Sequence, residues 1–146
     1  MRIRNLREIE VGICDGLTYG QVQEMFPEEY DARQSDKLRY RYPRGESYMD
    51  VITRLEPVIF ELERLRDPVI IIAHQAVLRC LYAYFLGPCS VQTNTYSCFI
   101  SNAAPCLLDL PAEEIPYLSI PLHTIIRLDK KAYGCKEKRF RLAASN

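Results

Sequence analysis

Residues Val69–Arg79, with the sequence VIIIAHQAVLR, decide the fold of this chain. The β-branched residues at the start of this stretch predict a strand that is buried on both faces. His74 stands where the strand ends, and a helical apolar pattern begins directly after it. At such a junction the unpaired N–H groups of the helix form an anion site at the sheet edge. The stretch therefore predicts an imidazole beside a phosphate-sized site, with Arg79 one turn further on.

Helical patterns flank the predicted strand on both sides. Ser47, with Asp50 three residues later, is typical of a capping box, and apolar residues then follow at helical spacing over 51–65. A second helix is predicted over Gln75–Phe85, where Gly87-Pro88 ends it. Helix, strand and helix in this order indicate an α/β fold.

The remaining elements are shorter. Thr18 and Gln21 fit a capping box for a short helix that ends near Pro27. Thr124–Asp129 is predicted to form a strand, and Arg139–Leu142 a short last one. We expect one domain over residues 1–142 and a tail over 143–146.

One stretch inside this domain has no structural signal. Pro88–Leu110 holds half of the cysteines, no basic residue and no periodicity. A structureless stretch of this length is unusual inside a compact domain. We interpret residues 88–110 as an atypical insert: a surface excursion, a splice-variant segment or an error of the gene sequence.

Composition excludes several classes of protein. The 146 residues carry 19 basic and 19 acidic side chains, so net charge suggests neither a nucleic-acid nor a membrane partner. No apolar run is long enough to span a bilayer. The six cysteines have no metal-ligand spacing, and a chain of this size needs no disulfides, so we expect reduced thiols in the cytosol.

Two groups could move a proton or a phosphoryl group. His74 occupies the predicted strand end beside Gln75, although a single histidine near a core is often structural. Glu8 lies in the turn-rich loop LREIEVGICDG and would serve as a general acid if burial raised its pKa. The alternative is that Glu8 and its neighbour Glu10 are ordinary surface carboxylates.

A basic, tyrosine-rich stretch follows the first helices and is typical of a lid over an anionic ligand. Charge-assisted hydrogen bonds to phosphate contribute about 1.5–3 kcal/mol each, so a few would hold a sugar phosphate. A solvated basic turn is the simpler interpretation, and RNA binding is disfavoured by the zero net charge. The stretch comprises Arg33, Lys37, Arg39, Arg41 and Arg44, with Tyr19, Tyr40, Tyr42 and Tyr48 nearby.

Four segments together resemble a known family. Residues 6–23, 39–64, 69–86 and 115–136 are similar to the bisphosphatase domain of 6-phosphofructo-2-kinase/fructose-2,6-bisphosphatase enzymes, within the histidine phosphatase and phosphoglycerate mutase-like superfamily. The resemblance implies a mostly parallel sheet flanked by helices. It also implies hydrolysis of fructose 2,6-bisphosphate to fructose 6-phosphate and phosphate through a phosphohistidine, without a metal or other cofactor.

The resemblance assigns roles by position. Glu8 resembles the acid that protonates the leaving sugar oxygen, and His74 resembles the second active-site histidine, which stabilises the transferring phosphoryl group. The residues that resemble the sugar- and 6-phosphate-binding set are Tyr19, Arg33, Lys37, Arg41, Tyr48, Gln75 and Arg79. A homodimer through the ATP-binding kinase domain of the parent enzyme is a further implication.

The family's nucleophile lies in an Arg-His-Gly signature on the first strand, and this tripeptide does not occur in the sequence. We therefore expect an incomplete bisphosphatase domain, a C-terminal fragment or an isoform, with little activity alone and with exposed strand edges. The alternative is a non-catalytic remnant that binds sugar phosphates or pairs with a full-length subunit.

Overall fold

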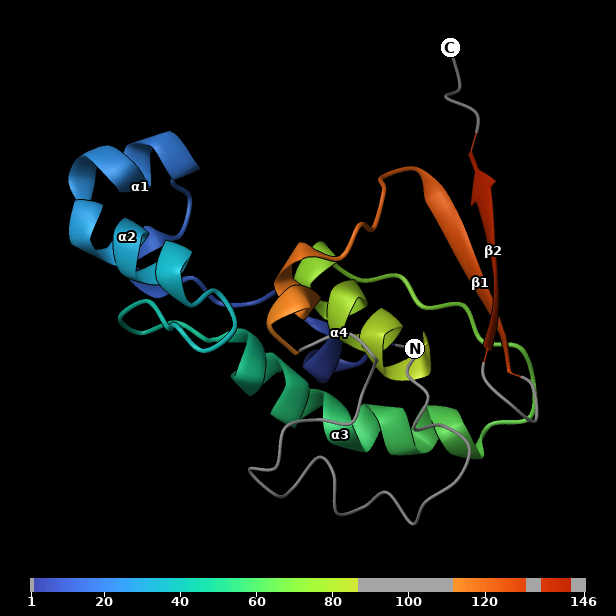
Figure 1. The fold of residues 1–146 in the computed structure, drawn as a ribbon. Coiled ribbons are helices and arrows are strands. Elements are labelled where there is room, and N and C mark those ends of the chain that lie inside the picture. Colours follow the sequence, from blue (N-terminus) through green and yellow to red (C-terminus); the bar gives the residue numbers. More distant parts are fainter. Residues whose placement is uncertain (1, 87–111, 131–134, 143–146) are drawn as a thin grey trace.

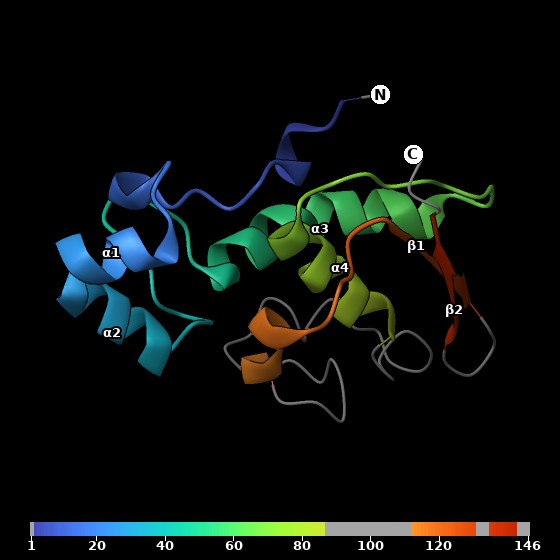
Figure 2. The ribbon, with the colours of Figure 1, turned by 90° about the horizontal axis from the view of Figure 1, so that it is seen from above.

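The computed structural model describes residues 2–86, 112–130 and 135–142 (Figure 1). Helices α3 and α4 form the middle of the molecule, with α1 and α2 at one end and a β-hairpin at the other (Figures 1 and 2). Short 3-10 turns cover residues 4–6, 12–14 and 112–117. The helices and strands are α1 (Tyr19–Met25), α2 (Pro27–Ser35), α3 (Tyr48–Arg64), α4 (Gln75–Leu86), β1 (Thr124–Lys130) and β2 (Cys135–Arg141).

Both predicted capping boxes are present. Thr18 accepts a hydrogen bond from the backbone N–H of Gln21, whose side chain accepts one from the backbone of Thr18. Ser47 and Asp50 repeat this exchange at the start of α3, over 2.7 Å from Ser47 N to Asp50 Oδ2. Each box satisfies two N–H groups that have no partner within the helix, and so fixes where α1 and α3 begin.

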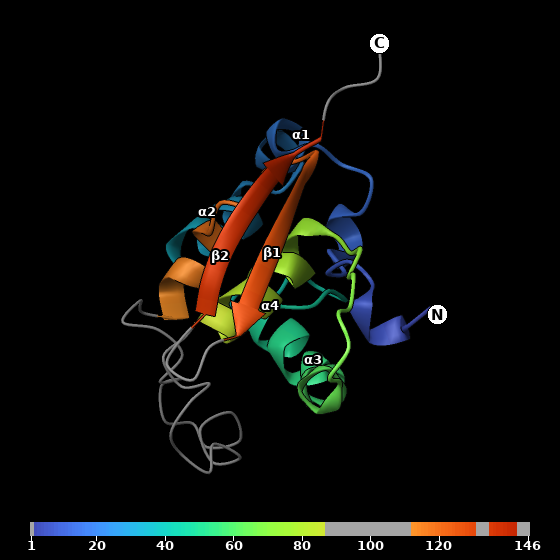
Figure 3. The same cartoon turned by 90° about the vertical axis from the view of Figure 1, so that its right-hand side faces the viewer.

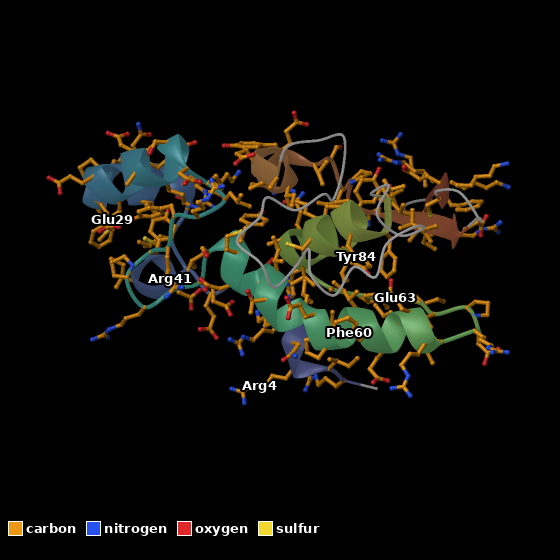
Figure 4. All side chains as sticks on the ribbon, turned by 60° about the horizontal axis from the view of Figure 1, so that its bottom comes forward. Arg4, Glu29, Arg41, Phe60, Glu63 and Tyr84 are labelled. Atoms are coloured by element: carbon orange, nitrogen blue, oxygen red, sulfur yellow. The ribbon has the colours of Figure 1, made fainter. Side chains whose placement is uncertain are left out.

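The main core lies between α3 and α4. Val51 and Leu55 of α3 and Val77 of α4 have less than 2% of their surface exposed, and Leu38 and Ile115 cover them from other segments. The hydroxyl of Tyr84 donates to Glu63 Oε1 over 2.6 Å, which joins α3 and α4 near their C-terminal ends (Figure 4). The helical periodicity of residues 51–65 therefore predicted the buried face correctly except at Leu65, which follows the end of α3 and is 53% exposed.

A smaller cluster holds α1 and α2 against the loops beside them. Cys14, Val22 and Tyr42 are buried together, and the Tyr40 and Tyr42 rings meet edge to face with centroids 5.5 Å apart. Residues 36–47 form loop and turn, whereas α2 continues to Ser35 and so includes Arg33 of the basic stretch. The loop that carries Arg41 lies beside the first turn of α3, where Arg41 pairs with Asp50.

The strand predicted at Val69–Ala73 differs from expectation. The segment is extended, but within the described ranges it pairs with no other strand. Ile71 and Ala73 pack against the α3–α4 core, whereas Ile70 is 88% and Ile72 is 90% exposed. The prediction of burial on both faces was therefore wrong, because burial of a central strand needs partner strands and a second helical layer that this sequence segment cannot specify.

The sheet of the described residues is the antiparallel hairpin of β1 and β2, in which Ile125 lies opposite Phe140 (Figure 3). Glu137 of β2 accepts a 2.8 Å hydrogen bond from the hydroxyl of Tyr82 of α4, and Arg139 of β2 donates to the same hydroxyl over 3.0 Å. The strand predicted from Thr124 is confirmed, and β2 begins earlier than predicted. The insert at 88–110 and the tail at 143–146 lie outside the described residues.

Candidate active site

Glu8 and His74 lie close together beside the start of α4. His74 lies directly before α4, where its carbonyl accepts the first helical hydrogen bond from Leu78 N over 2.9 Å. Its Nδ1 is 3.6 Å from Oε2 of Glu8, while Oε1 of Glu8 accepts a 2.9 Å hydrogen bond from the N–H of Ile9. Both side chains remain open to solvent, at 65% and 41% exposure, so a substrate can reach the pair.

Arg79 follows His74 on α4 and is held by neutral acceptors. Its Nη1 donates to the hydroxyl of Tyr48 over 3.1 Å, and its Nε donates to the carbonyl of Leu118 over 2.9 Å. Tyr48 is buried, and this burial raises the pKa of its phenol despite the nearby guanidinium. Tyr48 therefore stays protonated at neutral pH and leaves the charge of Arg79 uncompensated.

Arg33 on α2 and Lys37 in the turn after it both lie against tyrosine rings. The guanidinium of Arg33 lies 5.6 Å from the ring centroid of Tyr19 and 5.7 Å from that of Tyr42. The ammonium of Lys37 lies 4.7 Å from the ring centroid of Tyr117. Aromatic faces attract cations without neutralising them, so both charges remain available to an anion.

The cationic side chains lie close enough to influence one another. The pKa of Lys37 is lowered, first by burial and then by the positive charges of Arg33 and Arg79. The thiol of Cys80 is sensitive to both Arg79 and Glu8, and its burial raises its pKa to about 12. Arg33, Lys37 and Arg79, called the cationic cluster below, therefore lie within electrostatic range of one another, and Arg79 lies on the helix that His74 directly precedes.

This cluster has no acidic partner in the part of the chain that the structure describes. Several other basic side chains do pair with carboxylates, as Arg39 does with Glu113 over 3.0 Å. Repulsive cations that converge without a carboxylate lower stability, and a bound anion would relieve this repulsion. The arrangement is thus typical of a site for a multiply charged anion.

The two remaining predicted binding residues have other partners. The amide nitrogen of Gln75 donates to the carbonyl of Ile120 over 3.4 Å, which links the start of α4 to the 118–120 segment. Arg41 lies in the loop before α3 and forms an ion pair with Asp50 over 2.5 Å (Figure 4). Among the predicted set, Arg41 is the cation whose charge is already compensated.

Sequence reasoning missed part of the surroundings. Tyr117 and the carbonyls of Leu118 and Ile120 contact the predicted residues from a segment about forty positions after Arg79, and local pattern gave no signal for them. Arg54 and Glu46 were also missed, although a signal existed for Arg54. It stands three residues after buried Val51 and four before buried Val58, so a charged residue interrupts the apolar face of α3.

Across residues 2–86, 112–130 and 135–142, no group of three histidine, cysteine or acidic side chains is arranged to hold a metal ion. None of the helices in these ranges combines the length and apolar character that a bilayer crossing requires.

Comparison with known proteins identifies relatives whose names all include fructose-2,6-bisphosphatase. The chain is 52% identical over 139 residues to 6-phosphofructo-2-kinase/fructose-2,6-bisphosphatase of Arabidopsis thaliana, covering 95% of this chain and 16% of that protein. It is 48% identical over 131 residues to fructose-2,6-bisphosphatase of Saccharomyces cerevisiae and to 6-phosphofructo-2-kinase/fructose-2,6-bisphosphatase 1 of Homo sapiens. The aligned region covers 90% of this chain in both cases, and the chain spans only 24% and 23% of the lengths of these two relatives. The resemblance found in the sequence is thereby confirmed.

Solved structures and a family profile agree on the fold. A mycobacterial glucosyl-3-phosphoglycerate phosphatase superposes with a TM-score of 0.60 at 20% identity, covering 97% of this chain and 64% of that one. Mycobacterial hydrolase 1 gives a TM-score of 0.62 at 22% identity, with 99% and 63% coverage. The predicted α/β class is confirmed. Residues 2–120 match the profile of the histidine phosphatase superfamily, branch 1, and the chain belongs to this superfamily.

Proposed function

We propose that this chain forms the substrate-holding and acid–base part of a fructose-2,6-bisphosphatase site. The cationic cluster would bind the 6-phosphate, with Tyr19, Tyr48 and Gln75 lining the sugar. The Glu8–His74 pair would then face the 2-phosphate. The observation that carries this proposal is the convergence of Arg33, Lys37 and Arg79 without a carboxylate, beside Glu8 and His74 at 3.6 Å.

The proposed chemistry divides between the two members of the pair. Hydrolysis breaks the bond between phosphorus and O2 of the sugar, and the leaving oxygen then needs a proton, which the carboxyl of Glu8 would supply. His74 would donate a hydrogen bond to the phosphoryl oxygens and stabilise their charge during transfer. The carboxylate of Glu8 would afterwards accept a proton from the attacking water.

The nucleophile is the part of this reaction to which no described residue is assigned. The sequence contains two histidines, His74 and His123, and no Arg-His-Gly tripeptide. One imidazole cannot both attack the phosphorus and stabilise the oxygens on the same phosphoryl group. We therefore propose that the 146 residues alone bind the sugar phosphate but release phosphate slowly, since loss of a covalent nucleophile costs on the order of a millionfold.

Two measurements on the purified chain test the proposal together. Titration calorimetry should show that fructose 2,6-bisphosphate binds more tightly than fructose 6-phosphate, because the second phosphate adds contacts at Glu8–His74. Phosphate release from the bisphosphate should stay near the uncatalysed background. Equal affinity for the two sugars would remove the proposed role of the Glu8–His74 pair, and rapid turnover would refute the need for another nucleophile.

A second function, pairing with another subunit, is favoured by the unpaired segment at Val69–Ala73, which was predicted to be a strand. Ile70 and Ile72 are almost fully exposed, and within the described chain no backbone ladder covers this segment. An exposed strand with apolar side chains is a template for pairing with another chain. In this case the chain would bind sugar phosphates without turning them over, as part of a cytosolic assembly with a full-length enzyme.

Sedimentation tests the pairing function separately from binding of the sugar. The chain should co-sediment with a full-length bisphosphatase, and the double substitution Ile70→Lys with Ile72→Lys should abolish this. If the double variant co-sediments as the parent chain does, the unpaired segment is not the contact.

A further inference from the structure

A guanidinium on α3 holds the loop that carries Glu8. Arg54 Nη2 donates to the carbonyls of Arg7 over 2.9 Å and Glu8 over 3.2 Å, and its Nη1 donates to the carbonyl of Asn5. The contacts span 46 to 49 positions of sequence, so they fix the loop to α3. A planar guanidinium suits this task because it directs several donors at fixed angles.

The same guanidinium is paired with a carboxylate. Arg54 Nε lies 3.0 Å from Glu46 Oε1, and its Nη2 lies 3.1 Å from Glu46 Oε2, so the pair is bidentate. The two side chains are only 13% and 14% exposed. Glu46 also accepts from the backbone N–H of Glu10 over 3.2 Å and from Arg7 over 3.3 Å. Removal of Glu46 would leave the buried charge of Arg54 without a carboxylate, whereas removal of Arg54 would leave Glu46 with Arg7 as its remaining cation.

Main-chain contacts reinforce this arrangement. Glu46 N donates to the carbonyl of Glu10 over 2.6 Å, and Ile13 N donates to the carbonyl of Pro43 over 3.1 Å. The loop of Glu8 is therefore joined to the loop before α3 at Glu10 and Ile13, and the side chain of Glu46 links this contact to Arg54.

We propose that Arg54 is a positioning residue, which with Glu46 holds the backbone of Glu8 so that its carboxylate faces His74. The proposal rests on the proposed function, in which Glu8 is the acid. Each of the three guanidinium nitrogens of Arg54 donates to Glu46 or to a main-chain carbonyl of the loop, so Arg54 acts on the reaction through Glu8 and not through the substrate.

The experiment uses nuclear magnetic resonance of the two histidine rings in the whole chain. Glu8→Gln is expected to shift the ring resonances of His74, because the carboxylate is 3.6 Å away, and to leave those of His123 unchanged. The same comparison is then made in an Arg54→Met background. If Arg54 positions Glu8, the shift caused by Glu8→Gln falls to less than about half of its original size.

Matched variants separate positioning from general stabilisation. Arg64→Met changes the same residue type on α3, where the side chain is 80% exposed, and should keep the full shift. Arg54→Lys keeps the charge beside Glu46 but cannot reach all of the carbonyls, so it should also reduce the shift. It decides the question if Arg54→Met does not fold.

An undiminished Glu8→Gln shift in the folded Arg54 variants would overturn the proposal, even if their melting temperatures fall. A purely stabilising residue would give that outcome. Failure of the proposed function would differ from this, since sugar-phosphate binding would then be absent while the coupling between Glu8 and His74 still depended on Arg54.

Discussion

Arg79 donates a 3.1 Å hydrogen bond to the hydroxyl of Tyr48, and this bond joins α4 to the first residue of α3. Because Tyr48 is buried, the bond fixes the guanidinium at the junction of the two core helices. The stability of the α3–α4 core is thus used to hold a cation whose partners are neutral oxygens. A cation so placed is prepared for an anionic ligand.

Arg79→Met should weaken binding of fructose 2,6-bisphosphate. The loss of a charged hydrogen-bond donor to phosphate corresponds to about 1.5–3 kcal/mol, or about 10- to 150-fold in Kd. Titration calorimetry measures this, with Arg64→Met as the control because that side chain is exposed and remote in sequence. Equal losses in both variants would indicate a general charge effect.

The lowered pKa of Lys37 predicts a pH dependence with a definite sign. Over the interval between this pKa and the ordinary value of 10.5, the unfolded chain binds more protons, so the stability of the free protein rises with pH. A bound anion favours the ammonium form. Binding therefore takes up protons in this interval, and affinity for the sugar phosphate should fall as pH rises through it.

Lys37→Met tests the origin of that dependence. It should remove the alkaline step in affinity, weaken binding at neutral pH, and raise the melting temperature of the free chain by about 1–2 °C because repulsion is relieved. Lys138→Met on the exposed surface of β2 should do none of this. A lower melting temperature in Lys37→Met would contradict the view that the cluster is strained without its ligand.

Gly12 is predicted to be essential for the shape of the Glu8 loop. Its φ is +55°, and a Cβ there would collide with the carbonyl of Pro43 and lie 2.7 Å from the backbone nitrogen of Gly45. Gly12→Ala should lower the free energy of unfolding by several kcal/mol, roughly 3. Gly16, with φ +78° and open space around its Cα, provides the matched control, and Gly16→Ala should lose only about 1 kcal/mol. Urea denaturation of both variants gives the comparison. Equal losses would show that the loop of Gly12 does not contact the loop of Pro43 and Gly45.

Side-chain exposure along residues 69–73 predicts an alternation of mutational effects. Ile70→Thr and Ile72→Thr should change the free energy of unfolding by less than about 0.5 kcal/mol, since both side chains are in solvent. Ile71→Thr should cost about 1–2 kcal/mol because Ile71 packs on the core. Large losses at Ile70 and Ile72 would mean that this face is covered in solution.

Local signals in the sequence predicted the helices well. The capping boxes at Thr18 and Ser47 and the helical spacing after Val51 depend on residues within a few positions of one another, and α1 and α3 begin where these signals place them. The strand at Val69–Ala73 was only half correct, because extended conformation is a local preference whereas a ladder requires partner strands.

The site shows the same division between local and distant information. His74 and Arg79 could be selected from the strand-to-helix junction, whereas Glu8 needed the family resemblance, because its loop pattern alone fits an ordinary surface carboxylate. The bonds from Arg54 to the Glu8 loop and from Arg79 to the carbonyl of Leu118 join segments about forty or more residues apart, so no local pattern revealed them. Arg41 was grouped with the cluster by proximity in sequence, whereas Asp50 compensates its charge.

The central claim is that the cationic cluster and the Glu8–His74 pair form one site for a doubly phosphorylated sugar. The most direct measurement follows the ring resonances of His74 and His123 while fructose 2,6-bisphosphate or fructose 6-phosphate is added. The account predicts that the bisphosphate shifts His74 strongly, that fructose 6-phosphate shifts it weakly, and that His123 responds to neither. Binding of the bisphosphate with no change at His74, or with equal changes at both histidines, would contradict it.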